Sequence, residues 1–440
     1  MALLPLFAKG SSLDGLAQTS LPSASPEKMG STEARQNVTR EERMRWWHKA
    51  RFGMFVHLGI YSATARKEWV MYEEGIPTAD YELFVDWYNP MPGAPREWAR
   101  LARQAGMNYI VFTAKHHEGF CNFDTKLTQY TSVVLGPKRD LVREYVEAAR
   151  AEGLRVGIYY SLMDWHHPDG YTCASDSSAR RRFVDYTHGL IRELLTNYGK
   201  IDILWYDMPI PLDRAGWESD RMNEIVFSLQ PEIVVNNRNQ MPGDFATPEQ
   251  TIGDNATGRA WESCMTLNES WGFQQADDNW KSAKTIVRNL IDCAADGGNY
   301  LVNIGPRADG SIPTPSRQIL SEVGFWLQRN RESVFETDPC AVESTTYASF
   351  TQKGNLLYMH VFFWPGEHVG FGGLVTKVKS ARLLATGQPV DVEQTHLNVR
   401  LTGLPSEPPE WPVTTFVLEC ERAPKQDSAI VNRDRLRPHV

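Results

Sequence analysis

The chain has 440 residues, which a prior of about 150 residues per domain divides into two or three domains with ample core. Its 46 basic and 54 acidic residues give a net charge of −8, so the chain lacks the positive field that binds a nucleic-acid backbone, and we expect no nucleic-acid partner. The composition is 42% hydrophobic and includes 14 Trp, which excludes a disordered chain and is typical of proteins that stack sugars on aromatic rings.

Residues 1–35 are rich in Ser, Gly, Pro and Thr without periodicity, and they predict a flexible leader. The leader has no clear basic region before its short apolar run, so the sequence leaves export and a cytoplasmic location equally open. No apolar run reaches the roughly 18 residues of a membrane-spanning helix, so we expect no membrane insertion. Six widely separated cysteines predict free thiols with at most one disulfide.

Residues 36–335 alternate apolar strand-like runs with amphipathic helical stretches. The helical stretches at 96–106, 140–153, 178–199 and 281–298 each end near a Gly, the residue preferred where a helix closes with positive φ. The strand-like runs cover 52–59, 109–117, 154–161, 201–207, 233–238, 261–267 and 300–305.

This alternation predicts an α/β fold in which helices wrap a parallel sheet, and an irregular (β/α)8-like barrel fits it best. Seven strand candidates are found, so one strand of the barrel is degenerate or was missed. A doubly wound open sheet is the alternative. No Gly-rich loop follows the first strand, which argues against a dinucleotide-binding version of that sheet.

After residue 335 the helical period disappears and short alternating runs follow. We predict a C-terminal β-sandwich over residues 336–422 and a polar tail over 423–440. The predicted strands of the sandwich are 346–352, 355–363, 377–386, 391–401 and 414–421.

Unusual residues gather at the carboxyl ends of the predicted barrel strands, where barrels of this kind build their active sites. Structural roles would scatter such residues between both ends of the strands, so the pattern predicts a functional rim. The rim comprises His57, Glu68, Trp69, His116, His117, Tyr159, Tyr160, Trp205, Asp207, Arg238 and Glu249.

The adjacent residues His116 and His117 have three interpretations. Neighbours on a strand point to opposite faces, so a shared metal ion is disfavoured, and no other ligand spacing in the chain suggests one. We therefore expect neither metal nor cofactor. Two structural histidines remain an alternative, and hydrogen bonding to sugar hydroxyls, which imidazole can both accept and donate, is favoured.

Asp207 ends an otherwise apolar run, so its carboxylate must be hydrogen-bonded or face a cavity. It is either a structural cap or, as we favour, a catalytic carboxylate with Glu68, Glu249 or Glu262 as partner. Two carboxyl groups in different surroundings are what glycoside hydrolysis requires. No GxSxG elbow occurs, so a serine esterase lacks its nucleophile.

Several motifs follow one another over residues of about 43 to 310, namely RWWHKARFGMFVHLGIYS, KEWV, KHHEGF, GIYYS, LWYDM, WESCMTLNESWGF and YLVNIGPRADGSI. Together, and in this order, they resemble the glycoside hydrolase family 29 α-L-fucosidases. The family fold is an irregular barrel followed by a C-terminal β-sandwich, in agreement with the prediction above.

The resemblance implies an exo-acting retaining hydrolase of terminal α-L-fucose on glycans or glycoconjugates, with Asp207 as nucleophile. It places Trp205 beside the sugar, Arg238 near the acid/base and Trp271 near the fucose methyl. The remaining matches imply fucose binding by His57, Glu68, Trp69, His116, His117 and Tyr159.

The general acid has no fixed family motif. Glu249 lies in a long loop after the fifth strand, whereas Glu262 begins a predicted strand and would lie at the wrong end of the barrel. We therefore favour Glu249 and keep Glu262 as the alternative acid/base. A fucose-binding lectin-like module and a glycosidase of other specificity remain alternative functions, and the oligomeric state is open, with a homo-oligomer among the options.

Overall fold

The computed structural model describes residues 38–253 and 258–427, so the predicted leader at 1–35 and most of the polar tail lie outside it. A seven-stranded parallel sheet has the order β5-β4-β3-β2-β1-β7-β6. Its strands are β1 (Phe52–Val56), β2 (Tyr109–Lys115), β3 (Arg155–Ser161), β4 (Ile203–Asp207), β5 (Val234–Val235), β6 (Glu262–Thr266) and β7 (Asn299–Ile304). Each strand overlaps one of the predicted runs.

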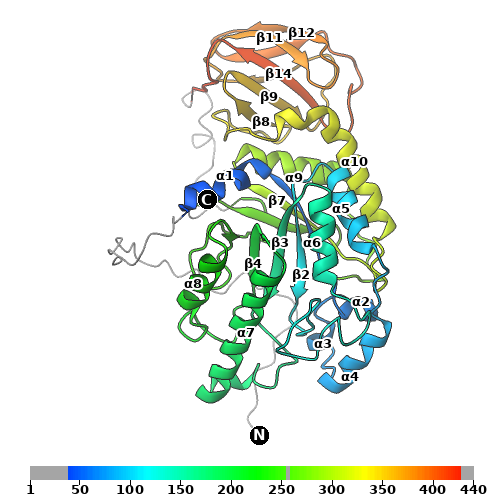
Figure 1. Cartoon of the computed structure of the whole chain (residues 1–440). Helices are drawn as coiled ribbons and strands as arrows, with labels where there is room; N and C mark the ends of the chain where they lie inside the picture. The colour runs from blue at the N-terminus through cyan, green and yellow to red at the C-terminus, as the bar shows by residue number, and fades with distance from the viewer. Residues whose placement is uncertain (1–37, 254–257, 428–440) are drawn as a thin grey trace, which may run out of the picture. The chain divides into compact units, whose positions relative to one another are not determined.

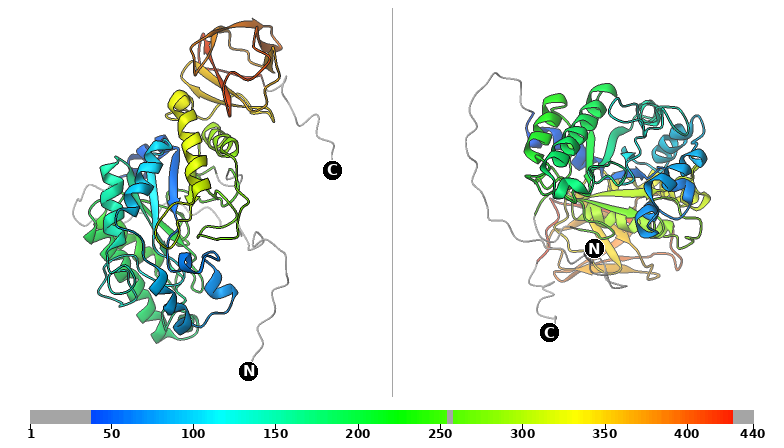
Figure 2. Two further views of the ribbon diagram at one scale, coloured as in Figure 1. Left: turned by 90° about the vertical axis from the view of Figure 1, so that its right-hand side faces the viewer. Right: turned by 90° about the horizontal axis from the view of Figure 1, so that it is seen from below.

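Helices pack on the outer side of this sheet, as Figure 1 shows for α5 and α6 beside β2. Four of the five long helices between the strands, α5, α6, α7 and α9, were predicted; α8 was not. The helical elements are α1 (Arg40–Ala50), α2 (Tyr61–Thr64), α3 (Val70–Glu73), α4 (Thr78–Glu82), η2 (Leu83–Trp87), α5 (Ala94–Gln104), α6 (Leu141–Ala151), η3 (Thr172–Ala174), α7 (Ser177–Asn197), α8 (Ser219–Leu229), α9 (Ala283–Ala295), α10 (Thr314–Asn330) and η4 (Arg331–Ser333). Figure 2 shows them from two further directions.

The place of an eighth strand, between β5 and β6, is taken by residues 244–250. The amide of Asp244 donates to the carbonyl of Val235 at 2.7 Å, which joins the segment to β5. On its other side the amides of Glu262 and Cys264 donate to the carbonyls of Ala246 and Pro248 at 2.9 and 3.0 Å. Because proline has no amide hydrogen, Pro248 interrupts a regular ladder. This short, irregular segment closes the barrel, so the missing strand is degenerate, and the open-sheet alternative was wrong.

Side chains of the strands alternate between two cores, as a period of two residues requires. Met54, Phe112 and Tyr160 belong to the large core between the sheet and its helices. The barrel interior holds instead residues such as Phe55, Tyr159 and Trp205. Tyr160 therefore faces away from the interior, and its predicted place at the functional rim was wrong.

A second, antiparallel sheet of seven strands has the order β10-β13-β12-β11-β14-β9-β8. Phe350 on β8 and Phe371 on β10 lie 4.7 Å apart between ring centroids, so the sheet curls until its two edge strands face each other across one core. This confirms the predicted C-terminal β-sandwich. Its strands are β8 (Ala348–Lys353), β9 (Leu356–Val361), β10 (Val369–Gly372), β11 (Val378–Leu383), β12 (Pro389–Gln394), β13 (Asn398–Thr402) and β14 (Thr414–Cys420).

Helix α10 links the two sheets. The indole of Trp326 donates to the carbonyl of Val413 at 2.8 Å, and Arg329 and Asn330 both donate to Glu410 at 2.9 Å. All six cysteines are free thiols. Among the described residues, no helix is both long and apolar enough to cross a membrane.

Candidate active site

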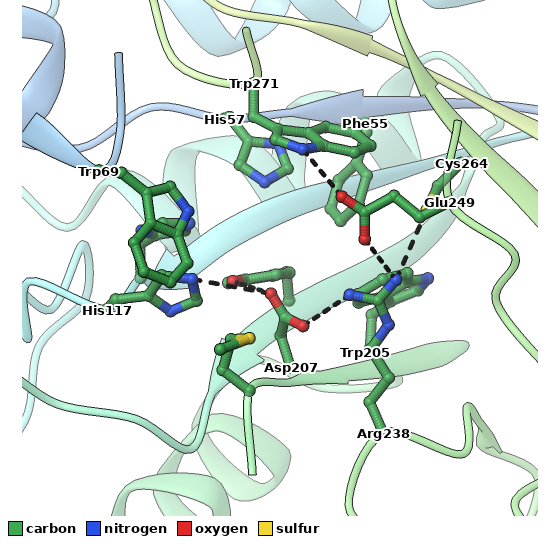
Figure 3. A pocket seen from close by; sticks show the side chains of 13 residues that line it. Phe55, His57, Trp69, His117, Trp205, Asp207, Arg238, Glu249, Cys264 and Trp271 are labelled. Carbon is green, nitrogen blue, oxygen red and sulfur yellow. Dashed lines mark hydrogen bonds and ion pairs between the residues drawn. The ribbon is translucent and has the colours of Figure 1, made fainter. Parts of the chain in front are cut away.

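A pocket opens at the carboxyl ends of β1 to β4 and beside the segment 244–250. Ten predicted site residues line it, together with three that sequence reasoning missed, Phe55, Met208 and Cys264. Figure 3 shows Asp207 and Trp271 on opposite sides of the pocket, Glu249 and Arg238 on one flank, and Trp69 and His117 on the other. The ten predicted residues are His57, Trp69, His116, His117, Tyr159, Trp205, Asp207, Arg238, Glu249 and Trp271.

Asp207 ends β4 with both carboxylate oxygens engaged. Its Oδ2 accepts a hydrogen bond from the Tyr159 hydroxyl at 2.6 Å, and its Oδ1 accepts one from Arg238 Nη1 at 2.8 Å. Burial alone would raise the pKa of Asp207, but the charge of Arg238 and these hydrogen bonds lower it well below its ordinary value. The carboxylate is therefore ionised at neutral pH.

Arg238 connects Asp207 to the second carboxylate of the pocket. While Nη1 binds Asp207, Nη2 donates to Glu249 Oε2 at 2.7 Å, and the guanidinium lies 4.7 Å from the ring of Trp205. The other oxygen of Glu249 accepts a hydrogen bond from the Trp271 indole at 3.2 Å. One planar cation thus holds two carboxylates at the edge of the same pocket.

His57 is held as a neutral acceptor. The amide of Asn303 donates through Nδ2 to the carbonyl of Trp271 at 2.7 Å and so presents Oδ1 to His57 Nδ1, also at 2.7 Å. The proton therefore lies on Nδ1, which leaves Nε2 with a lone pair. Burial and the neighbouring His116 lower the pKa of His57 to about 3, which keeps the ring neutral.

His117 has the same arrangement. Ser161 Oγ donates to the carbonyl of Met163 at 2.9 Å and therefore accepts from His117 Nδ1 at 2.7 Å. Nε2 is left as an acceptor 4.0 Å from Asp207 Oδ2, and burial holds the pKa of His117 well below its ordinary value. The two histidines thus present lone pairs suited to hydroxyl donors.

Both His116 and His117 reach the pocket because β2 ends at Lys115, after a shift in its pairing with β3. The alternation that disfavours a shared metal ion therefore does not apply here. Among the described residues there is still no group of three His, Cys, Asp or Glu side chains placed to hold a metal ion.

Glu68 and Glu262 do not line the pocket. Glu68 Oε2 accepts a hydrogen bond from the amide of Gly272 at 2.7 Å, which ties the loop after β1 to the loop that carries Trp271. Burial raises the pKa of Glu68. Its implied contact with fucose stays a prediction.

Glu262 lies in the barrel interior at the amino end of β6. It accepts hydrogen bonds from the Tyr109 hydroxyl at 2.6 Å and from the Trp205 indole at 3.0 Å. Gly53 leaves the space that the Tyr109 ring fills, since a Cβ there would lie 2.3 Å from that ring. Burial raises the pKa of Glu262 to about 7. The carboxyl group supports Trp205 from beneath the pocket.

Comparisons with known proteins agree with this geometry. A family model described as Alpha-L-fucosidase matches residues 19–332. Tissue alpha-L-fucosidase of Rattus norvegicus is 31% identical over 363 residues, which cover 74% of this chain and 77% of that protein. Plasma alpha-L-fucosidase of Homo sapiens is 28% identical over 401 residues, which cover 82% of this chain and 86% of that protein.

Solved structures give the same result. Alpha-L-fucosidase isoenzyme 1 from Paenibacillus thiaminolyticus superposes with a TM-score of 0.82 at 37% identity, over 87% of this chain and 99% of that one. A GH29 alpha-L-fucosidase from Bacteroides thetaiotaomicron, solved as a trapped covalent intermediate with 2-fluoro-fucosyl fluoride, has a TM-score of 0.81 at 26% identity, over 90% and 100% of the two chains.

Proposed function

The chain belongs to the α-L-fucosidase family of glycoside hydrolases, and on that premise we propose that it releases terminal α-L-fucose from fucosylated glycans by a retaining double displacement, with Asp207 as nucleophile and Glu249 as acid/base. The observation that carries this assignment is the shared hydrogen bonding of both carboxylates to Arg238. Neighbouring nitrogens of one guanidinium keep the two groups close together, and retaining glycosidases place theirs about 5–5.5 Å apart.

In the first step a carboxylate oxygen of Asp207 bonds to the anomeric carbon as the bond to the leaving oxygen breaks. Glu249 gives its proton to that oxygen. In the second step water attacks the same carbon, Glu249 takes a proton from the water, and the bond to Asp207 breaks. Two inversions at one carbon return the α configuration.

Arg238 serves both steps. In the free enzyme its charge is shared between Asp207 and Glu249. Once Asp207 has become a neutral ester, the hydrogen bond from Arg238 Nη2 still holds Glu249 at the edge of the pocket for the second step.

An apolar wall explains a preference for fucose. The rings of Phe55 and Trp271 lie 5.9 Å apart between centroids, and both line the pocket. Fucose carries a methyl group where common hexoses carry a hydroxymethyl group, and burial of one such carbon stabilises binding by about 0.8 kcal/mol. A hydroxyl at the same position would face rings that offer it no hydrogen bond.

Two assays test the proposal. Turnover of nitrophenyl α-L-fucoside should exceed that of nitrophenyl β-D-galactoside by about a hundredfold or more. The galactoside is a D-sugar whose ring is of the opposite hand to that of L-fucose, it carries an additional hydroxyl at C6, and its leaving group is equatorial where that of the α-L-fucoside is axial. NMR of the first-formed sugar should show α-L-fucose before mutarotation. Initial β-L-fucose would exclude the double displacement and leave the family assignment in place.

Replacement of His117 by alanine should reduce kcat/KM for an aryl fucoside by about ten- to a hundredfold, because the sugar hydroxyl that donates to Nε2 loses its acceptor. His188 is a matched control: it is also a buried histidine, but it lies in α7 and hydrogen-bonds the carbonyl of Trp217. The His188→Ala enzyme should keep the wild-type kcat/KM per folded molecule. Activity of His117→Ala within about twofold of wild type would return His117 to a structural role.

A further inference from the structure

A buried carboxylate lies next to one of the pocket histidines. Glu118 is 1% exposed, and neither of its oxygens has a hydrogen-bond partner among the described residues. Its Oε2 lies 3.4 Å from Nδ1 of His116, and this nitrogen is also buried without a partner. Buried polar groups are almost always hydrogen-bonded, because the loss of contact with water otherwise costs stability. Each of these two groups is therefore placed to be the partner of the other.

A tight turn at the end of β2 brings Glu118 to this position. The amide of Gly119 donates to the carbonyl of His116 at 3.1 Å, and Gly119 has a φ of 82°, which glycine adopts without strain. The loop after β3 holds the turn, since the amide of Trp165 donates to the carbonyl of His117 at 2.7 Å. As a result His116 lines the pocket, whereas Glu118 is buried outside its lining.

Gly59 leaves the room that the carboxylate occupies. A Cβ at this position would lie 2.4 Å from Glu118 Oε1 and 2.5 Å from Cε1 of Tyr61. On its other side the Tyr61 ring is confined by Gly272, whose Cβ would lie 2.7 Å from Cδ2 of that ring. The Tyr61 ring also contacts the His116 ring, at 5.2 Å between centroids. Two glycines thus fix Tyr61 against His116, and the carboxylate shares this enclosed space.

The other two pocket histidines show what a partner at Nδ1 does. His57 turns Nδ1 to Asn303 Oδ1 at 2.7 Å. His117 turns Nδ1 to Ser161 Oγ, also at 2.7 Å. In both, the oxygen holds the proton on Nδ1 and leaves Nε2 as an acceptor. His116 likewise turns Nδ1 to an oxygen, but this oxygen belongs to a carboxylate, which when ionised accepts hydrogen bonds and cannot donate them.

We propose that Glu118 is a positioning residue for His116, which accepts the Nδ1 proton and so leaves Nε2 as a third lone pair for a hydroxyl of the bound sugar. This inference rests on the proposed function, because the sugar is the substrate of the same pocket. The 3.4 Å contact is longer than the roughly 2.7–2.9 Å of a charge-assisted hydrogen bond, and contacts of this kind commonly shorten when substrate binds.

Packing alone does not supply this function. The His116 ring stacks on Tyr159, with centroids 5.5 Å apart and planes inclined by 13°. Such a contact sets the plane of the ring, but it does not select which nitrogen carries the proton. That selection requires a hydrogen bond at one nitrogen, and Glu118 is the group placed to accept it.

Glu118→Gln tests the proposal, because it keeps the shape of the side chain and adds an amide donor. The amide can donate to Nδ1, which moves the proton of His116 to Nε2 and puts a donor where the pocket had an acceptor. We expect kcat/KM for an aryl fucoside to fall about three- to thirtyfold. Because Glu118 acts through His116, the same substitution should cause no further loss in a His116→Ala background.

Nitrogen-15 NMR of enzyme labelled at histidine gives a readout that does not depend on turnover. The ring signals of His116, identified by their absence from His116→Ala, should show a protonated Nδ1 and an unprotonated Nε2 in the wild type.

Glu410→Gln is the matched control. The side chain of Glu410 is 5% exposed and one of its oxygens is also buried without a partner, but the other accepts from Arg329 and Asn330 beside the antiparallel sheet. Its replacement should alter neither kcat/KM per folded molecule nor the His116 signals.

Two results would overturn the proposal. An equal loss from Glu118→Gln in the wild-type and His116→Ala backgrounds would show that Glu118 does not act through His116. A proton on Nε2 of His116 in the wild type would overturn it as well, and this measurement requires no folded Glu118 variant. Absence of fucoside hydrolysis by the wild-type enzyme would instead contradict the proposed function itself.

Discussion

Replacement of Asp207 by alanine is expected to lower kcat for aryl α-L-fucosides by about a thousandfold or more while the protein stays folded. The side chain lies at the end of β4 against the pocket and not in the packed core between sheet and helices. Its partner Arg238 keeps its hydrogen bonds to Thr247 and Glu249 in the variant. Thermal unfolding should therefore change little, and the loss should appear in turnover.

Asp202 provides a matched control at the other end of the same strand. It is also a buried carboxylate, and it accepts hydrogen bonds from the amide of Val156 at 2.9 Å and from Arg155 at 2.8 Å. Asp202→Asn should cost some stability and leave kcat per folded molecule within about twofold. A rate above a few per cent of wild type in Asp207→Ala would show that another group is the nucleophile.

Azide gives a second measurement on the same variant. A small anion can enter the space that the carboxylate vacates and attack the anomeric carbon from the same side as Asp207 did. Only one inversion then occurs, so the product should be the β-fucosyl azide. Recovery of activity with azide and a product of α configuration would contradict the assignment of Asp207.

Much of the barrel could be predicted because its strands are apolar on both faces. Runs such as 52–59 and 109–117 must be buried, and their carboxyl ends fix the rim where His57, His116 and His117 meet. The segment that takes the place of the eighth barrel strand could not be predicted. Residues 244–250 read DFATPEQ, and a segment with Pro248 and few apolar residues has no strand signal, although neighbouring strands hold it in place.

The direction in which a side chain points was harder to predict than the position of its strand. Phe55 lies two residues before His57 on β1, so the period of a strand could have placed both on the interior face, and this signal was missed. Glu68 follows a strand in an irregular loop, where spacing says nothing about orientation. Its contact with Gly272, 204 residues away, depends on tertiary structure alone.

In the sandwich, two strands were missed for local reasons. Residues 391–401 were predicted as one strand but form most of the hairpin β12–β13, because its turn contains neither Gly nor Pro. Strand β10 includes Gly370 and Gly372, which a single sequence marks as turn residues. Pairing with β13 overrides that preference.

The second large effect concerns the general acid. Protonation of the leaving oxygen matters more, the more basic that oxygen is. The rate of hydrolysis by Glu249→Ala should therefore fall about tenfold or less with 2-chloro-4-nitrophenyl fucoside and about 10²–10⁴-fold with a fucosyl-oligosaccharide. Azide should also accelerate turnover of the aryl substrate by this variant. It attacks the β-linked fucosyl-enzyme in place of activated water, and the product should be the α-fucosyl azide, opposite to that from Asp207→Ala.

Glu262 supplies the comparison that decides this assignment. Glu262→Gln removes the acidic proton but can still accept the hydrogen bond from the Trp205 indole, so it tests acid catalysis without opening a cavity. Glu262 lies beneath Trp205 and outside the pocket lining. We therefore expect any loss of activity in Glu262→Gln to be equally large with 2-chloro-4-nitrophenyl fucoside and with a fucosyl-oligosaccharide. A large gap between the two substrates and an α-azide product in a Glu262 variant, with neither in Glu249→Ala, would transfer the role of acid/base to Glu262.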